Sequence, residues 1–364
     1  MKIGIVTYHR TLNYGAVMQS LATRFVLEEM GHEVYYVDYW PNYHKEKYEM
    51  FPKEKFKNYN ILRKVYFLII LLLRYKSKRK RIDNFEKFFQ SHIYPYCRSV
   101  DDSFDVVIYG SDQIWRKQKE IGDYNPFYFG DNKINTQHHI SYAASMGILP
   151  KSEADKAKVK ELVSHIEKVS VREEGLRQLL LSLDYKDVTL SLDPTLLLTS
   201  EEWDKHLPTE KYEDKKYALM YIMGANAFDM KEAKKFTESK GLKLIVLRGY
   251  ATTRETSTNL TSAGPLEFIR LIKGAEYVFC ASFHGLAFSI IYGKQFFTSF
   301  VNNAGRAESL LNLLDIPERL LPYKSIIPDN LLPINYVDVH KKLGSLRKIS
   351  IDFLVNIKNE RIQL

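Results

Sequence analysis

One histidine stands where a buried strand is expected to pass into a helix. The segment EYVFCASFHGLAFSIIYG, from Glu276 to Gly293, contains an apolar run, a Ser-Phe-His-Gly turn and a second apolar run. This pattern predicts that Ser282, His284 and Gly285 lie at the carboxyl end of a strand, where a helix begins. An imidazole at that place could act as a general acid. The alternative is a structural histidine that caps the helix. The helix dipole disfavours the charged imidazole, so an acid there needs a nearby anion to hold its proton.

A second candidate follows the first predicted strand, in the segment YHRTLNYGA. It lacks the G-x-G-x-x-G spacing of dinucleotide-binding loops. Asn13, Tyr14 and Gly15 stand directly before or within the start of a helix, where an anion or a sugar hydroxyl could bind. The alternative is that Asn13 and Gly15 only form the turn.

A third candidate is the segment GSDQIW, from Gly110 to Trp115. The side chains of Asp112 and Gln113 could bind sugar hydroxyls, and Trp115 could pack against the face of a sugar ring. The alternative is that Ser111 and Asp112 cap the next helix.

Two charged residues also follow predicted strands. Arg172 ends the strand in VSVREEG, and its guanidinium could bind a carboxylate or phosphate in bidentate fashion. The spacing equally fits a salt bridge to Glu173 or a neighbour. Asp193 precedes Pro194, so its backbone is expected to be extended, either in a plain turn or at a functional site.

These residues are expected to lie on an α/β fold with two Rossmann-like domains that face a cleft. The start of the chain predicts a strand (KIGIVTY), a helix that ends at Gly31 and a second strand (HEVYYVDY), which together form a βαβ unit with parallel strands. Strands and helices alternate again in the second half. In such sheets ligands bind beyond the carboxyl ends of the strands, and the candidates are found in those loops.

The predicted domains are an N-terminal one over residues 1–200 and a C-terminal one over 216–336, separated by a polar junction at 200–216. The N-terminal domain is expected to contain a basic helical insertion at 41–103. A helical tail at 337–364 is expected to cross back to the first domain.

Composition restricts the class of protein. The 364 residues are 45% hydrophobic and 27% charged, with a net charge of +9, which favours an anionic partner. Zinc-ligand spacings and the known nucleic-acid-binding motifs are absent from the sequence, so nucleic acid is not expected as a partner. With two cysteines, Cys97 and Cys280, and no signal-peptide pattern, a cytoplasmic location is expected.

The longest apolar run, Val65 to Leu73, is followed by the basic sequence RYKSKRKR. It is much shorter than the roughly 20 residues that a membrane span requires. One interpretation is a core helix that continues into a solvated basic face. The other is a peripheral contact of residues 61–81 with anionic lipid, at the inner face of a membrane.

Taken together, several segments resemble the polysaccharide pyruvyl transferase family. They are NYGAVMQ, GSDQIW, SYAASMG, VSVREE, LDPTLLL, GPLEFIRLIKGAEYVFCASFHGLAFSII and the R-x-x-x-L-L pattern from Arg306 to Leu311. Their order and spacing together are specific to that family. The resemblance does not extend to residues 45–104 and 252–263.

The resemblance implies a fold similar to the glycosyltransferase-B type. It also implies transfer of pyruvate from phosphoenolpyruvate onto a sugar as a ketal, in bacterial polysaccharide biosynthesis. The acceptor would be a sugar of the polysaccharide, such as an exopolysaccharide or capsule, or its lipid-linked precursor. Phosphoenolpyruvate would be a co-substrate, and neither a cofactor nor a metal is expected.

On this hypothesis His284 protonates the methylene carbon of the donor, and Asp112 serves as base for the attacking hydroxyl. Donor binding is assigned to the cations and to the helix start, namely Arg172, Arg306, Arg248, Ser282 and Gly285. Acceptor binding is assigned to Asn13, Tyr14, Gly15, Gln113 and Trp115. The N-terminal domain is accordingly expected on the acceptor side and the C-terminal domain on the donor side. Two other classes remain open: a glycosyltransferase with a nucleotide-sugar donor on the same fold, and a non-catalytic protein that binds anions or glycans.

Overall fold

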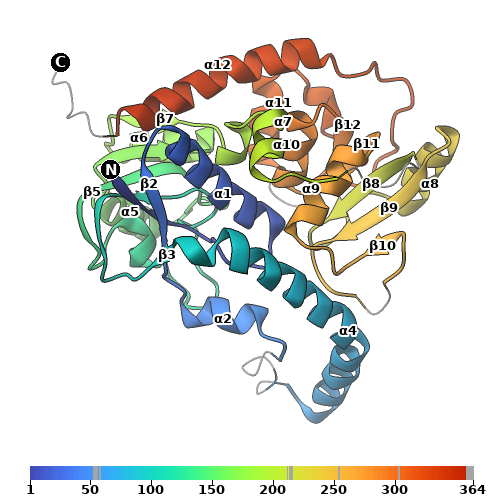
Figure 1. Ribbon diagram of the computed structural model, residues 1–364, viewed down its shortest axis with the longest axis horizontal. Helices are drawn as coiled ribbons and strands as arrows, with labels where there is room; N and C mark the ends of the chain where they lie inside the picture. The colour runs from blue at the N-terminus through green and yellow to red at the C-terminus, as the bar shows by residue number, and fades with distance from the viewer. Residues whose placement is uncertain are drawn as a thin grey trace.

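A computed structural model describes residues 1–51, 56, 59–210, 212, 216–252, 255–301 and 304–357. Within these ranges the strands form two sheets, one of seven strands and one of five, and every pairing between named strands is parallel. The two sheets lie side by side, and helices cover them (Figure 1). The predicted α/β fold with two Rossmann-like domains is thereby confirmed.

The N-terminal sheet has the strand order β3-β2-β1-β4-β5-β6-β7. Its strands are β1 (Lys2–Val6), β2 (Glu33–Val37), β3 (Cys97–Arg98), β4 (Ser103–Tyr109), β5 (Asn135–Ala144), β6 (Lys168–Val171) and β7 (Val188–Leu190). The helices of this half are α1 (Tyr14–Glu29), α2 (Asn42–Tyr48), α4 (Ile61–His92), α5 (Glu153–Val163), α6 (Glu174–Ser182) and α7 (Ser200–His206), with short 3₁₀ helices η1 (Tyr94–Tyr96), η2 (Pro126–Phe129) and η3 (Pro194–Leu196).

The C-terminal sheet has the order β10-β9-β8-β11-β12, the Rossmann pattern of a central first strand flanked on both sides. Its strands are β8 (Tyr217–Ile222), β9 (Lys243–Arg248), β10 (Asn259–Leu260), β11 (Tyr277–Cys280) and β12 (Gln295–Thr298). The helices are α8 (Met230–Ser239), α9 (Pro265–Gly274), α10 (Phe283–Ile291), α11 (Gly305–Leu313), η4 (Pro317–Arg319) and α12 (Tyr336–Val355).

Local sequence explains most of the boundaries that bear on the site. The Asn13 side chain caps α1 by accepting hydrogen bonds from the backbone amides of Gly15 and Ala16. Gly31 ends that segment with a φ of +84°, a conformation that glycine adopts without strain. The polar junction begins with helix α7, which a capping box between Thr199 and Glu202 initiates.

One of the three hydrophobic core clusters among the described residues spans the two domains. One cluster of buried side chains includes Ile3 and Tyr14 of the N-terminal half together with Tyr221 and Phe268 of the C-terminal half. The ring of Tyr14 stacks on that of Phe268 with centroids 4.9 Å apart. The packing therefore does not stop at the domain boundary.

Helix α12 spans both domains along one side of the molecule (Figure 1). The Ser350 hydroxyl accepts a hydrogen bond of 2.9 Å from the backbone amide of Leu192, and Arg347 donates to the carbonyls of Leu196 and Leu198. These contacts fix the segment between β7 and α7.

Helix α4 contradicts one interpretation of the sequence. The apolar residues of its first half are not core: Leu62 is 81% exposed and Leu72 is 74% exposed. The interpretation as a core helix was wrong, because apolar spacing shows only that a helix has an apolar face and not what covers it. No helix among the described residues is long and apolar enough to cross a membrane.

Candidate active site

His284 lies at the junction of the two domains, in the first turn of α10. Its side chain is 8% exposed, and Nε2 lies 3.5 Å from Oδ2 of Asp193, which belongs to the other domain. Nε2 is buried and makes no hydrogen bond with any described residue. The other ring nitrogen, Nδ1, faces helix α1: a Cβ atom added to Gly15 would lie 2.0 Å from it. The ring is thus enclosed between Asp193 and the start of α1.

Asp193 is the anion that a protonated His284 requires. It is fully buried at the start of η3, where its Oδ1 accepts hydrogen bonds from the amide and hydroxyl of Thr195. Its other oxygen accepts a hydrogen bond from Arg172. Burial alone would raise the pKa of Asp193, but Arg172 and His284 hold it well below the usual range. The carboxylate is therefore charged and lies beside the imidazole of His284.

Arg172 is held by protein carboxylates. Its side chain is 2% exposed and forms an ion pair with Asp193, the kind of neighbour that the sequence offered as the alternative to a ligand. Burial favours loss of its proton, but Asp193, Glu173 and Asp112 raise its pKa above the ordinary value. Nε and Nη2 of the guanidinium are buried without hydrogen-bond partners. They lie 3.6 Å from Glu173 and 3.9 Å from Asp112.

Three partly exposed side chains form the rim of this cluster: Asp112, Glu173 and Arg306. Arg306 Nε lies 3.8 Å from Oε1 of Glu173, which also accepts a hydrogen bond from Ser145. Burial, and then repulsion from Arg172, lower the pKa of Arg306 below the ordinary arginine value. Both guanidinium groups contact the ring of Phe283, at 5.1 Å for Arg172 and 5.4 Å for Arg306. The structure thus brings His284, Arg172, Arg306 and Asp112 together.

The residues predicted to bind an acceptor do not all lie at the cluster around His284. Gly15 contacts His284, and Gln113 is half-buried against Gly147. Asn13 is engaged as the cap of α1. Tyr14 is fully buried and donates a hydrogen bond to the carbonyl of Ala263, while Trp115 is fully buried and stacks on Phe129. Neither of these two rings offers a face to a sugar, because an aromatic residue beside a loop can equally well complete a core.

The other residues predicted to bind the phosphoenolpyruvate donor have different surroundings. Arg248 donates hydrogen bonds to Asn259 and Tyr250 of its own domain, and no described contact joins it to the cluster around His284. Ser282 is the N-cap residue of α10 without a side-chain capping bond. A Cβ atom on Gly285 would lie 2.8 Å from the ring of Tyr221 and 2.9 Å from Cβ of Cys280, so glycine permits close packing there.

Comparison with known families decides the class of this chain. The family model described as polysaccharide pyruvyl transferase matches residues 13–303, which is most of the chain and contains the whole cluster apart from Arg306. The chain belongs to the polysaccharide pyruvyl transferase family. It is therefore a transferase of polysaccharide biosynthesis.

Other comparisons add little to this. The sequence matches no curated protein. Among solved structures, the transferase is similar to a functionally uncharacterised protein from Klebsiella pneumoniae, with 11% identity, a TM-score of 0.47 and coverage of 89% of this chain and 93% of that one. It is also similar to the UDP-GlcNAc 2-epimerase of Methanocaldococcus jannaschii, with 11% identity, a TM-score of 0.45 and coverage of 98% and 99%. The glycosyltransferase SnogD of Streptomyces nogalater has 10% identity, a TM-score of 0.44 and coverage of 98% and 99%. Likenesses this distant give no information on activity.

Sequence reasoning about the transferase missed two members of the cluster. Asp193 was considered as a turn residue and was not assigned to the site, and Glu173 was considered only as a partner of Arg172. Both directly follow the ends of predicted strands, at the same edge of the sheet as Asp112. That shared position is the signal that could have identified them.

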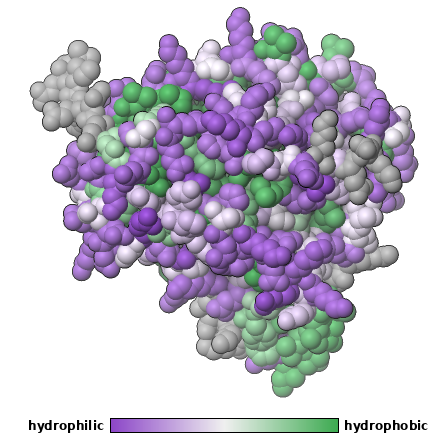
Figure 2. Space-filling view, in the orientation of Figure 1, coloured by the Kyte–Doolittle hydropathy of each residue, from purple (hydrophilic) through white to green (hydrophobic). Residues whose placement is uncertain are grey.

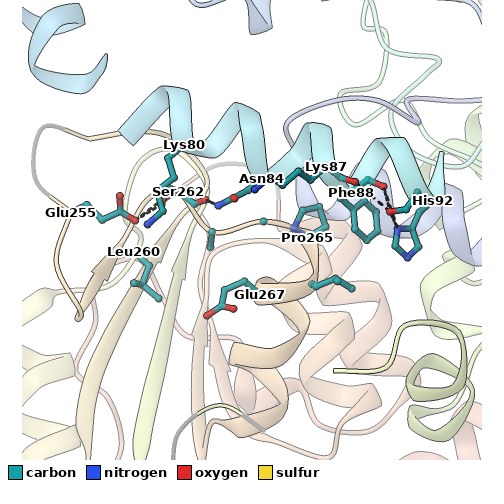
Figure 3. A pocket seen from close by; sticks show the side chains of 14 residues that line it. Lys80, Asn84, Lys87, Phe88, His92, Glu255, Leu260, Ser262, Pro265 and Glu267 are labelled. Carbon is teal, nitrogen blue, oxygen red and sulfur yellow. Dashed lines mark hydrogen bonds between the residues drawn. The ribbon is translucent and has the colours of Figure 1, made fainter. Parts of the chain in front are cut away.

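A groove of about 480 Å³ lies between the domains of the transferase, and His284 is not among the residues that line it. Lys80, Asn84 and Lys87 of α4 line one wall, and the segment before and within the start of α9 lines the other (Figure 3). Asn84 bridges the two walls by donating a 2.8 Å hydrogen bond to the carbonyl of Ser262. Among the described residues, no group of three or more histidine, cysteine, aspartate or glutamate side chains is placed to hold a metal ion.

Proposed function

We propose that this transferase moves pyruvate from phosphoenolpyruvate onto two hydroxyls of a sugar, as a cyclic ketal. The acceptor is a sugar of a bacterial polysaccharide or of its lipid-linked precursor. The observation that carries the proposal is the position of His284 between Asp193 and Gly15, at the junction of the domains. Membership of the pyruvyl transferase family supports the reaction class.

His284 is the proposed general acid. It gives its proton to the methylene carbon of phosphoenolpyruvate while a sugar hydroxyl adds to C2 and loses its proton to Asp112. Phosphate then leaves C2 with the electrons of its C–O bond and takes the proton from Asp112. A second hydroxyl adds to C2, closes the ring and gives its proton to the imidazole of His284, which restores the acid. The products are the pyruvate ketal and inorganic phosphate. The buried carboxylate of Asp193 lies 3.5 Å from Nε2 of this imidazole.

Arg306 is the proposed contact to the anionic donor. Its side chain is 20% exposed, whereas that of Arg172 is 2% exposed and paired with Asp193. The three carboxylates of Asp112, Glu173 and Asp193 balance Arg172, Arg306 and a protonated His284 in the absence of a ligand. Burial and Arg172 disfavour the charge of Arg306, so an incoming carboxylate or phosphate would stabilise it.

Binding can be tested without knowledge of the acceptor. Thermal unfolding of the wild type and of Arg306→Gln is measured with phosphoenolpyruvate and with a panel of nucleotide sugars. A ligand at about 100 times its dissociation constant stabilises a protein by about 2.7 kcal/mol. We expect stabilisation of the wild type by phosphoenolpyruvate that is lost in Arg306→Gln. Stabilisation by a nucleotide sugar alone would contradict the proposed donor and favour glycosyl transfer. Arg172→Ala is unsuitable, since it would leave Asp193 buried without its partner.

Catalysis is tested by phosphate release from phosphoenolpyruvate in the presence of acceptor glycans. His284→Gln retains a polar side chain of similar volume, so the protein should fold. We expect its turnover to fall by about 10²–10⁴-fold, the usual contribution of a positioned acid. Unchanged turnover in a folded His284→Gln would exclude this residue as the acid.

A further inference from the structure

The first half of α4 forms an exposed apolar surface on the molecule. We call the α4 tip the residues 61–76, which precede the point where the helix is anchored. The exposed apolar side chains of the tip share one face at helical spacing: Ile61, Leu62, Val65, Tyr66, Leu68, Ile69, Leu72 and Leu73. They form the apolar patch at the lower end of the molecule in Figure 2. An exposed patch of this kind marks an interaction surface.

The tip is supported from behind and anchored at its base. On its opposite face Phe67 contacts the rings of Phe51, Phe56 and Tyr59. At the base, Ser77 is hydrogen-bonded to Thr261 of the C-terminal domain. Arg81 donates to the hydroxyl of Tyr14 and to the carbonyl of Leu12. The tip therefore projects from an anchored base as a helix roughly 24 Å long at 1.5 Å per residue.

Charge identifies the partner. Residues 61–82 contain eight lysines and arginines and no aspartate or glutamate, so this stretch alone carries a charge of +8 in a protein with a net charge of +9. Lys76, Arg79 and Lys80 follow the apolar residues on the same side of the helix, one to two turns beyond Leu72 and Leu73. An apolar surface bordered by cations fits an anionic bilayer: the apolar side chains enter the acyl region and the cations contact the headgroups.

We propose that the α4 tip docks the protein on an anionic membrane surface. The apolar segment is too short to span a bilayer, so the tip inserts at the interface and the two domains remain outside. Tyr66 and Tyr75, both exposed, would lie at headgroup level, where aromatic side chains with a polar end are favoured. A second copy of this chain is a poorer partner, since pairing two tips would bring together two segments with a charge of +4 each, from Arg63, Lys64, Arg74 and Lys76.

Docking would place the groove beside α4 near the lipid, because Lys80 and Lys87 of the same helix line it. A lipid-linked acceptor could then approach the domain junction from the bilayer. This step alone rests on the proposed function. The docking itself does not depend on that function.

The test is flotation of the full-length protein with lipid vesicles. The vesicles are phosphatidylcholine alone, or phosphatidylcholine with phosphatidylglycerol. Leu62→Glu/Leu72→Glu places two carboxylates on the apolar face of the tip. Ile326→Glu/Leu332→Glu is the matched control, because these side chains are 75% and 82% exposed and lie outside α4. Lys76→Glu/Arg79→Glu tests the charge. Circular dichroism establishes that each variant is folded.

We expect the wild type and the Ile326/Leu332 control to float with anionic vesicles and to dissociate at high salt. Binding should fall by about tenfold or more in both tip variants. Equal binding of the tip variants and the wild type would overturn the proposal, as would absence of binding to anionic vesicles. Sedimentation without lipid tests the other occupant: a wild-type dimer that Leu62→Glu/Leu72→Glu dissociates, with no vesicle binding, would assign the tip to self-association instead.

Since vesicle binding requires neither phosphoenolpyruvate nor turnover, its failure is distinct from a failure of the proposed reaction.

Discussion

At the scale of single residues, the space for the His284 ring depends on a missing side chain. A Cβ atom on Gly15 would lie 2.0 Å from Nδ1 of His284, far inside van der Waals contact. We predict that Gly15→Ala lowers the free energy of unfolding by about 1–3 kcal/mol, the usual cost of overpacking, and displaces His284 so that turnover falls. Urea unfolding and the phosphate-release assay measure the two effects.

Gly344→Ala is the matched control for this change. Gly344 also lies in a helix, α12, but its added Cβ atom would meet nothing within 4 Å. Helix propensity alone should then stabilise the protein by about 0.5–1 kcal/mol. If Gly15→Ala were equally stabilising and fully active, the close approach of His284 to α1 would not exist in solution.

Asp193 offers a second test at this scale. Asp193→Asn leaves Arg172 buried without its carboxylate, so we predict a loss of about 3–5 kcal/mol in the free energy of unfolding. Asp184→Asn is the control, because Asp184 pairs with Lys160 at the surface with its side chain 83% exposed. It should change stability by less than about 0.5 kcal/mol. A loss for Asp193→Asn as small as that of the control would show that the ion pair is not formed.

The pH dependence of the same pair has a definite sign. The pKa of Asp193 in the folded protein is depressed, so its stabilising contribution is complete above the unfolded value of about 4 and is lost as the pH falls towards the folded value. The difference in stability between wild type and Asp193→Asn should therefore be constant near neutral pH and shrink below about pH 4. Chemical denaturation across that range measures it, and a difference that grows on acidification would contradict the assignment.

The sequence predicted the position of His284 but not the residue that supplies its anionic partner. His284 was expected at the start of a helix beyond a strand, and α10 begins there because an apolar strand ends at Cys280. The anion that it requires was expected to come from a ligand. The protein supplies it as Asp193, from the other domain and 91 positions earlier in the sequence. The position of Asp193 after a predicted strand could have placed it at the site, but no local pattern encodes its contact with His284 across the domains.

At the scale of elements, α12 holds the segment that carries Asp193. The amide of Leu192 donates to the Ser350 hydroxyl, and both groups are buried. Ser350→Ala leaves that amide without an acceptor, and we predict a loss of about 1–3 kcal/mol in the free energy of unfolding. Ser345→Ala, on an exposed turn of the same helix, should change stability by less than about 0.5 kcal/mol. Equal effects in urea unfolding would mean that α12 does not hold this segment.

The elements themselves were largely predictable, and the exceptions have physical reasons. Apolar runs bounded by glycine and polar turns located the buried strands β1, β4, β8 and β11, because fully covered parallel strands require continuous apolar sequence. The two-residue strand β10 lies inside a polar loop and pairs with β9 at the sheet edge, so it leaves no periodic signal. The exposure of the α4 tip was also beyond the sequence, since an apolar face looks the same whether protein, lipid or water covers it.

At the scale of the whole molecule, one core cluster spans the two domains, and hydrogen bonds from α4 connect them. Arg81 is 3% exposed and donates hydrogen bonds to Leu12 and Tyr14 of the N-terminal domain and to Thr261 of the C-terminal domain. Because a continuous core couples their unfolding, we predict a single calorimetric transition for the wild type, with equal calorimetric and van't Hoff enthalpies.

Replacing Arg81 should weaken that coupling. Arg81→Met retains the apolar stem but removes every hydrogen bond between the domains that this side chain makes, and leaves the Tyr14 hydroxyl without its donor. We predict a lower unfolding temperature and a transition broadened or split into two, because the unfolding of the two domains is then less strongly coupled. Arg79→Met is the matched control: Arg79 lies two residues earlier on α4, its side chain is 61% exposed, and it pairs only with Asp83 among the described residues. Scanning calorimetry of the three proteins decides the matter. Two transitions already present in the wild type, or the same thermogram for Arg81→Met and Arg79→Met, would show that the domains fold independently of this helix.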